Sequence, residues 1–290
     1  MFFYPLSTLW KAFHKIDSAI IAKYMPRGSI AYTFRCVADG ARDETEAAKK
    51  YAAECGLIHK TIDVHWEDYL EFSPVLMKRK GAPIHSIEPQ IYKASLIANA
   101  DGVKNLIFGE NADMIFGGLD GLISKDWLFD EFAARYAYID PARVLKKPVK
   151  IAEPFEEFRA GYKIDFYSFI CKYFYLEANG SYSNACGAAG VNYVSPFSQM
   201  ALDAPLDYSR IRSGEPKYML YEIFRSLYPG WPEPAKLPMP RAVGRWLRDW
   251  KGPIRPEFIE NAVAGLSADQ KWMVYILERF LNMIEREDHE

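Results

Sequence analysis

Three consecutive stretches decide the fold: SIAYTF (29–34), DETEAAKKYAAECG (43–56) and HKTIDV (59–64). The first and third are short and rich in β-branched and aromatic residues, a composition that favours strands. The middle stretch has acidic residues in its first turn and ends at Gly56, as helices commonly do. Because parallel strands need a crossover connection, this order predicts two parallel strands joined by a helix.

The same alternation continues toward residue 124. SIEPQIYKASLIANADG (86–102) predicts a helix that ends at Gly102, and KNLIFG (104–109) predicts a strand that leads into ENADMIFGG. Alternating strands and helices are typical of an α/β protein with a parallel, twisted sheet. Each strand then delivers its following loop to the same carboxyl edge, where ligands bind.

From about residue 125 onward, helical patterns dominate. Apolar residues recur at three- and four-residue spacing in DWLFDEFAARYAYI, IDFYSFICKYFYLEA, PKYMLYEIFRSLYP and DQKWMVYILERFLNMIERE. We therefore expect an α/β core over residues 1–124 and a helical C-terminal layer over residues 125–290. The Pro-rich segment 228–244 is expected to lie as an extended, ordered loop across the surface.

The amino-acid composition limits the classes of partner that the protein is expected to bind. The 290 residues carry 36 basic and 38 acidic side chains, so a net charge of −2 gives no field that would attract nucleic acid or an anionic membrane. A small-molecule or protein partner is expected. No apolar run reaches the ~18 residues of a membrane span and no signal peptide is recognisable, so we expect a cytoplasmic location. The four cysteines lack metal-ligand spacing and are interpreted as reduced, mostly buried thiols.

FGENADMIFGG (108–118) places two carboxylates, Glu110 and Asp113, directly after a predicted strand. Hard oxygen ligands hold Mg²⁺, and Mg²⁺ carries nucleotide phosphates. Alternatively, Asp113 caps a short helix and Glu110 is solvated. These residues alone leave both interpretations open.

Two further segments are ambiguous in the same way. In SGEPKYMLYEIF (213–224), Lys217 begins a predicted helix, where a cation opposes the helix dipole unless it serves a bound anion. It is otherwise a surface lysine whose stem lies along a tyrosine. In FHKIDS (13–18), Asp17 or Ser18 is the N-cap of a helix over 19–25, or both are what remains of a phosphate loop.

Together and in this order, the segments resemble the synthetase domain of the asparagine synthetase family, whose members are ATP pyrophosphatases with an S-G-G-x-D-S loop. The family's S-G-E-G-A-D-E-x-F-G-G motif resembles FGENADMIFGG, and its P-F-L-D segment resembles SPFSQ (195–199). Its G-x-x-K-x-x-L motif resembles residues 214–220, and its K-x-x-M run with a later W-L resembles KLPMPRAVGRWL (236–247). Five weak motifs in register are strong evidence in combination.

The resemblance implies an adenine nucleotide alpha-hydrolase-like sheet and an AMP-forming, ATP-dependent amide ligase. Such an enzyme adenylates a substrate carboxylate and then transfers ammonia or an amine to it. By the same resemblance, Asp17 and Asp113 would bind magnesium, and Asp17 and Ser18 would contact the phosphates. Glu110 and Lys217 would be catalytic. The adenine would be flanked by Tyr32, Thr33, Phe34 and the turn 107–109 with Phe108 and Gly109. ATP and Mg²⁺ are the implied cofactors.

The sequence departs from the family's pattern in three places. His14 and Lys15 stand where the loop has its two glycines, Asn111 replaces the motif glycine, and Gln199 replaces the P-F-L-D aspartate. The family's glutaminase domain has no counterpart here, so we expect nitrogen from solution, from an ammonia-supplying or amine-presenting partner protein, or from an amine on the substrate. A degenerate homologue acting as a binding or regulatory subunit is the alternative; thiolation is disfavoured by the absence of paired catalytic cysteines.

Overall fold

The computed structural model describes residues 16–234 and 239–287. Its strands are short, and they are β1 (Ile30–Cys36), β2 (Ile58–Val64), β3 (Asn105–Ile107), β4 (Arg159–Ala160), β5 (Lys163–Ile164) and β6 (Asn192–Val194). Its α-helices are α1 (Ile16–Tyr24), α2 (Thr45–Glu54), α3 (Trp66–Lys80), α4 (Glu88–Ala100), α5 (Ala112–Ile115), α6 (Asp120–Ile123), α7 (Phe129–Ala137), α8 (Phe166–Phe169), α9 (Tyr175–Ala188), α10 (Tyr208–Arg212), α11 (Tyr218–Leu227), α12 (Val243–Trp246) and α13 (Ala268–Glu287). Short helices of other types are η1 (Pro141–Arg143), η2 (Glu153–Phe158), η3 (Ile170–Phe174) and η4 (Pro196–Gln199).

The predicted strand–helix–strand unit is confirmed. Strands β1 and β2 are parallel and pair from Ile30 opposite Ile58 to Cys36 opposite Val64, with α2 as the crossover. Most of β1 is buried, because α1 and α4 cover its two faces: Ala31 packs with α1, whereas Tyr32 and Phe34 pack with α4. Burial on both faces explains why this strand reads as an almost continuous apolar run.

A second parallel pair joins β3 to β6, with Asn105 opposite Asn192 and Ile107 opposite Val194. Strand β6 is not among the predicted elements, and it shows that the chain beyond residue 125 contributes a strand to the α/β part. The α/β class is therefore confirmed. Within residues 16–234 and 239–287 the parallel strands form separate pairs, so the adenine nucleotide alpha-hydrolase-like sheet stays a prediction, as does the division after residue 124.

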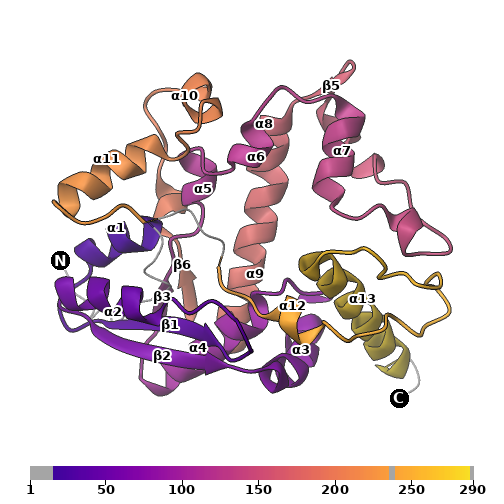
Figure 1. Cartoon of the computed structure of the whole chain (residues 1–290), viewed down its shortest axis with the longest axis horizontal. Coiled ribbons are helices and arrows are strands. Elements are labelled where there is room, and N and C mark those ends of the chain that lie inside the picture. The colour runs from indigo at the N-terminus through magenta and orange to yellow at the C-terminus, as the bar shows by residue number, and fades with distance from the viewer. Residues whose placement is uncertain (1–15, 235–238, 288–290) are drawn as a thin grey trace.

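The C-terminal half is largely helical, as expected. Helix α8, the π-helical turn η3 and α9 follow one another without a break and form the long rod near the centre of Figure 1. Helix α13 lies to one side of this rod and α11 lies above α1. No helix within the described part of the chain is both long enough and apolar enough to cross a membrane.

The prediction of a surface loop for the Pro-rich segment is confirmed for residues 229–233, which are irregular and mostly exposed, and is wrong for residues 239–243. Residues 235–238 lie outside the described residues, but Met239, Ala242 and Val243 are buried, and Val243 begins α12. Met239 and Val243 join the main apolar core with Trp272 of α13. Proline has no N–H that needs a partner, so a Pro-rich segment with apolar side chains can be buried at little cost in hydrogen bonds.

Candidate functional site

Packing of α11 on α1 brings together two segments that are far apart in the sequence. Leu220 and Phe224, four residues apart on one face of α11, are buried in the same apolar cluster as Ile16 and Ile20 of α1. Each such side chain contributes about 1.5–3 kcal/mol when it is buried. The hydroxyl of Tyr228 also donates a hydrogen bond to the Ala19 carbonyl at 2.6 Å. These contacts fix the start of α11 beside the start of α1.

Lys217 forms a buried ion pair at this junction. Its Nζ donates to both carboxylate oxygens of Asp17 at 2.8 Å, and it lies 3.0 Å from Oδ1 of Asp113. Burial alone would lower the pKa of Lys217, but the charges of Asp17 and Asp113 outweigh burial and hold that pKa above its ordinary value. Lys217 is therefore a permanent cation between two carboxylates.

This arrangement decides among the earlier interpretations. Asp17 and Ser18 lie within the first turn of α1, so the prediction that one of them caps a helix over 19–25 is wrong. Lys217 is 4% exposed, so the interpretation as a surface lysine is also wrong. The structure brings Asp17, Asp113 and Lys217 together, while their roles toward ATP and Mg²⁺ stay predictions.

Asp113 owes its position to the unusual backbone of Asn111. Asn111 is buried and has a φ of 67°, in the left-handed region that asparagine tolerates better than most non-glycine residues. Its side-chain amide donates to Asn179 of α9 at 3.0 Å and to Ser195 at 3.3 Å. These hydrogen bonds hold the turn after β3, so that α5 starts with Asp113 directed toward Lys217.

Two glycines allow these elements to approach closely. A Cβ at Gly118 would lie 2.1 Å from Oδ1 of Asp113 and 2.2 Å from Cε of Lys217. A Cβ at Gly109 would lie 2.9 Å from Cβ of Asp17 and 3.3 Å from Oγ of Ser18. Any larger residue at either position would displace the ion-pair cluster, so both glycines are required by packing.

Glu110 belongs to a different part of the site. Its backbone carbonyl accepts a hydrogen bond from Ser195 Oγ at 2.6 Å, and its side chain lines a cavity of about 730 Å³ between α9 and α13. Burial, together with the charge of Glu110 and a hydrogen bond to it, raises the pKa of Tyr182 well above its ordinary value. The structure thus pairs the Glu110 side chain with Tyr182.

The predicted adenine-binding residues have buried side chains. Tyr32 donates to Asp101 at 2.7 Å, Thr33 Oγ1 lies 3.0 Å from His59 Nε2, and Phe34 packs in the main core. The ring of Phe108 contacts Tyr182, with centroids 4.9 Å apart. Any contact of these residues with a nucleotide would therefore use their backbone, and their role stays a prediction.

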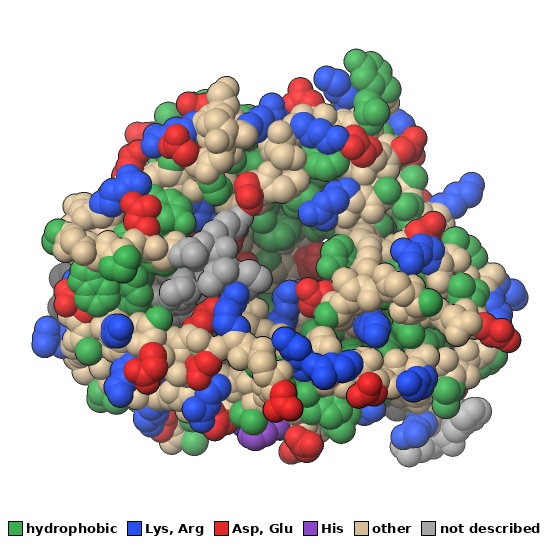
Figure 2. Space-filling view, in the orientation of Figure 1, with side chains coloured by type: hydrophobic (Ala, Val, Ile, Leu, Met, Phe, Trp, Pro, Cys, Tyr) green, Lys and Arg blue, Asp and Glu red, His purple; other side chains and the backbone are tan. Residues whose placement is uncertain are grey.

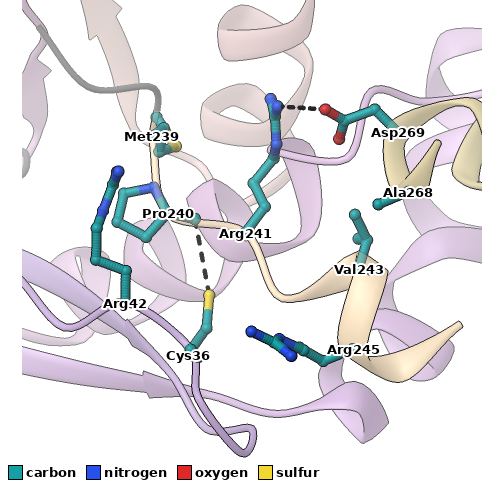
Figure 3. A pocket seen from close by; sticks show the side chains of 11 residues that line it. Cys36, Arg42, Met239, Pro240, Arg241, Val243, Arg245, Ala268 and Asp269 are labelled. Atoms are coloured by element: carbon teal, nitrogen blue, oxygen red, sulfur yellow. Dashed lines mark hydrogen bonds and ion pairs between the residues drawn. The ribbon is translucent and has the colours of Figure 1, made fainter. Parts of the chain in front are cut away.

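A second pocket lies at the carboxyl end of β1, and Met239, Arg241 and Arg245 of the segment KLPMPRAVGRWL (236–247), to which the sequence interpretation gave no role, line it. Figure 3 shows Arg42 and Arg245 on either side of Cys36, and Arg241 paired with Asp269 at 2.9 Å. The Cys36 thiol lies 3.7 Å from the Pro240 carbonyl, and burial raises its pKa to about 11. It is therefore a neutral thiol at physiological pH, and it is free and buried, as the sequence interpretation expects.

The donor set of the Lys217 cluster fits a magnesium ion. Two carboxylates, Asp17 and Asp113, already share one cationic nitrogen, which shows that their oxygens converge. No group of three or more His, Cys, Asp or Glu side chains that could hold a metal occurs within residues 16–234 and 239–287. Two carboxylates suffice for Mg²⁺, which usually keeps waters and takes further oxygens from phosphates.

The family described as asparagine synthase matches residues 16–173, more than half of the sequence, and the match includes Asp17, Glu110 and Asp113. The chain belongs to the asparagine synthase family. No curated protein matches the chain. In this asparagine synthase relative, Asn111 stands where the motif S-G-E-G-A-D-E has its second glycine. The positive φ of Asn111 explains why a glycine suits that position. Asparagine keeps the left-handed turn, so this departure preserves the backbone geometry.

Proposed function

We propose that this protein is an AMP-forming, ATP-dependent amide ligase. Membership of the asparagine synthase family supports an ATP-dependent synthetase in general. The observation that carries the specific proposal is the convergence of Asp17, Asp113 and Lys217, two carboxylates and one lysine held against glycine backbone. This combination of charges suits the triphosphate of a Mg·ATP complex.

The proposed reaction has two steps. A substrate carboxylate oxygen attacks the α-phosphorus of ATP, the bond to pyrophosphate breaks, and an acyl-adenylate forms. Ammonia or an amine then attacks the acyl carbon, loses a proton, and displaces AMP to leave an amide. Lys217, held protonated by its two carboxylates, would offset the charge that grows on pyrophosphate. Glu110 would accept the proton of the incoming amine.

Asp17 and Asp113 are the residues that would hold magnesium. The metal would supply positive charge at the phosphate oxygens, and Lys217 would turn from the carboxylates toward the phosphates when the metal binds. The substrate, a small-molecule carboxylic acid, and a partner protein that supplies ammonia or presents an amine belong to the same proposal. Neither nucleic acid nor a membrane is part of it.

The alternative is a degenerate synthetase with weak or no turnover that acts as a binding or regulatory subunit. Two observations favour it: Lys217 already neutralises the carboxylates, and His14 and Lys15 replace the glycines of the family's loop. His14 and Lys15 lie outside the described residues. Side chains at these positions would deprive a bound pyrophosphate of enclosing backbone N–H groups.

A pyrophosphate-exchange assay with Mg·ATP over a panel of carboxylic acids tests the ligase proposal. Exchange that depends on one acid supports it, whereas no exchange and no ATP binding across the panel contradict it. ATP affinity of the parent chain and of a His14→Gly, Lys15→Gly variant tests the alternative. Tight Mg·ATP binding by the parent that is lost in the variant would show that the altered loop is functional and that degeneracy is the wrong account.

A further inference from the structure

The cavity that contains Glu110 has walls built from two helix faces. On the rod, Phe174, Ala178 and Tyr182 recur at four-residue spacing and so lie on one face. Trp272, Met273 and Ile276 of α13 form the opposite wall. Figure 2 shows the molecule hollowed near the centre of this face, over the position of α9 in Figure 1. Two apolar helix faces therefore line a cavity of about 730 Å³ that is open to solvent on one side.

Large apolar side chains are left exposed along this space. Met273 is 43% exposed and Tyr138, at the end of α7, is 41% exposed, and both line the cavity. Tyr138 also has a φ of 65°, a conformation that costs energy in a residue with a bulky side chain. Exposed apolar surface in a concave site beside a predicted catalytic residue indicates a ligand that covers it.

Two of the cationic side chains that line the cavity are paired within the protein. Lys80 pairs with Glu88 at 2.7 Å, and Arg241 pairs with Asp269 at 2.9 Å. The hydroxyl of Tyr136 donates to Glu177 at 3.2 Å. Arg135, Glu110 and Glu177 line the cavity as well, so these ion pairs neutralise only part of its charge, and the choice of ligand rests on the apolar walls and the volume.

The volume of the cavity indicates a bulky ligand. Pockets of about 300–1,000 Å³ enclose ligands of drug size. An acid of the size of aspartate would leave most of the 730 Å³ and both helix faces in contact with water. An aromatic or branched aliphatic body would remove these faces from water and gain the corresponding hydrophobic free energy.

We propose that the carboxylic acid activated by this protein carries a bulky aromatic or aliphatic body, which fills the cavity between α9 and α13 while its carboxylate lies at the Glu110 end. The inference rests on the proposed ligase function for the identity of the reacting group. The cavity itself is independent of that function, so binding and turnover can be tested separately.

Turnover is tested by pyrophosphate exchange with two sets of acids. One set holds aspartate and glutamate, and the other holds N-acetylphenylalanine, 4-phenylbutyrate and the dipeptide Phe-Leu. We expect the bulky set to give kcat/KM values about tenfold or more above the small set, since each buried apolar group adds discrimination. Equal or faster exchange with aspartate would overturn the inference while supporting the ligase function.

Binding is tested by titration of the full chain with the same acids, by calorimetry and by tryptophan fluorescence, because Trp272 lines the cavity. We expect the bulky acids to bind and aspartate to bind weakly. If no acid supports exchange but the bulky acids bind, the cavity inference stands and the ligase function fails. If the bulky acids do not bind, the inference is wrong whatever the exchange assay shows.

Two variants test whether the ligand binds in this cavity. Ala178→Phe on α9 and Met273→Trp on α13 fill the space from opposite walls, and we expect each to weaken binding of the bulky acids about tenfold or more with ATP affinity unchanged. Ser183→Phe, at an exposed position of α9 away from the cavity, is the matched control and should bind as the parent does. Unchanged binding in both folded cavity variants would contradict the assignment.

Discussion

Lys217 Nζ lies 2.8 Å from each carboxylate oxygen of Asp17, although 200 residues separate the two in the sequence. The packing of α11 on α1 makes this contact possible, and the turn after β3 adds Asp113 to it. Both Lys217 and Asp17 are about 5% exposed at the side chain, so the ion pair takes the place of water around each charge.

Lys217→Met should lower the free energy of unfolding by about 3–5 kcal/mol, because it removes the cation that donates to both oxygens of the buried Asp17 carboxylate. It should also abolish any pyrophosphate exchange. Chemical denaturation followed by circular dichroism measures the first effect. The Asp17→Asn, Lys217→Met double variant removes both charges and should recover part of the lost stability, but no activity. A single variant as stable as the parent would contradict the role given to the pair.

Gly118→Ala should reduce activity about a hundredfold, since a methyl group there collides with Asp113 Oδ1 and Lys217 Cε and moves both groups. The control is Gly180→Ala, an exposed helical position in α9 where a Cβ would meet no atom within 4 Å. That control should keep full activity and gain about 0.5–1 kcal/mol in stability, because alanine favours the helix over glycine. Equal activity of the two variants would argue against close packing at Gly118.

Tyr32→Phe should cost about 1 kcal/mol of stability, because it removes the hydrogen bond to Asp101 at 2.7 Å. ATP affinity should stay unchanged, since the Tyr32 side chain points into the core and only its backbone is available to a nucleotide. Tyr24→Phe, at a residue that is 71% exposed, serves as the control and should change neither quantity. A large loss of ATP affinity in Tyr32→Phe would show that the hydroxyl contacts the nucleotide.

His85 makes stability depend on pH. Burial, and next the positive charge of Arg241, lowers the pKa of His85 from 6.5 to about 4. Between these values the unfolded chain binds a proton that the folded chain does not, so the free energy of unfolding should fall as the pH falls from 6.5 toward 4. His85→Asn keeps an acceptor for the Ile87 N–H but cannot titrate, so its stability should change less over this range. Identical pH profiles would exclude His85 as the cause.

The strand–helix–strand unit could be predicted from the sequence because its signals are local. Periodicity and helix-end residues define β1, α2 and β2 within 35 residues of Ile30. Helix α3 was not predicted, because Pro74 interrupts its apolar pattern and its N-cap residue is a histidine, which is not a usual capping residue. The His65 N–H donates a hydrogen bond to the Asp68 carboxylate in the first turn. Strand β6 has three residues, too few for a period to show.

The sequence allowed the residues of the candidate site to be predicted, but not the contacts between them. The residue types of Asp17, Asp113 and Lys217 indicated anion and metal chemistry, while their contact depends on the packing of α11 against α1. The hydrogen bonds of Asn111 to Asn179 and Ser195 join three distant segments and leave no mark in local sequence. Asn111 itself carried a signal, because asparagine is a residue that accepts a positive φ.

The long separation between Asp17 and Lys217 has a consequence for synthesis of the protein in a cell. A ribosome adds about 5–20 residues per second, so the 200 residues between them take roughly 10–40 s to make. During this interval the β1–α2–β2 unit can already form, but the lysine that pairs with the Asp17 carboxylate has not yet been synthesised. The ion pair between Asp17 and Lys217 can therefore form only after α11 has been synthesised and has packed on α1.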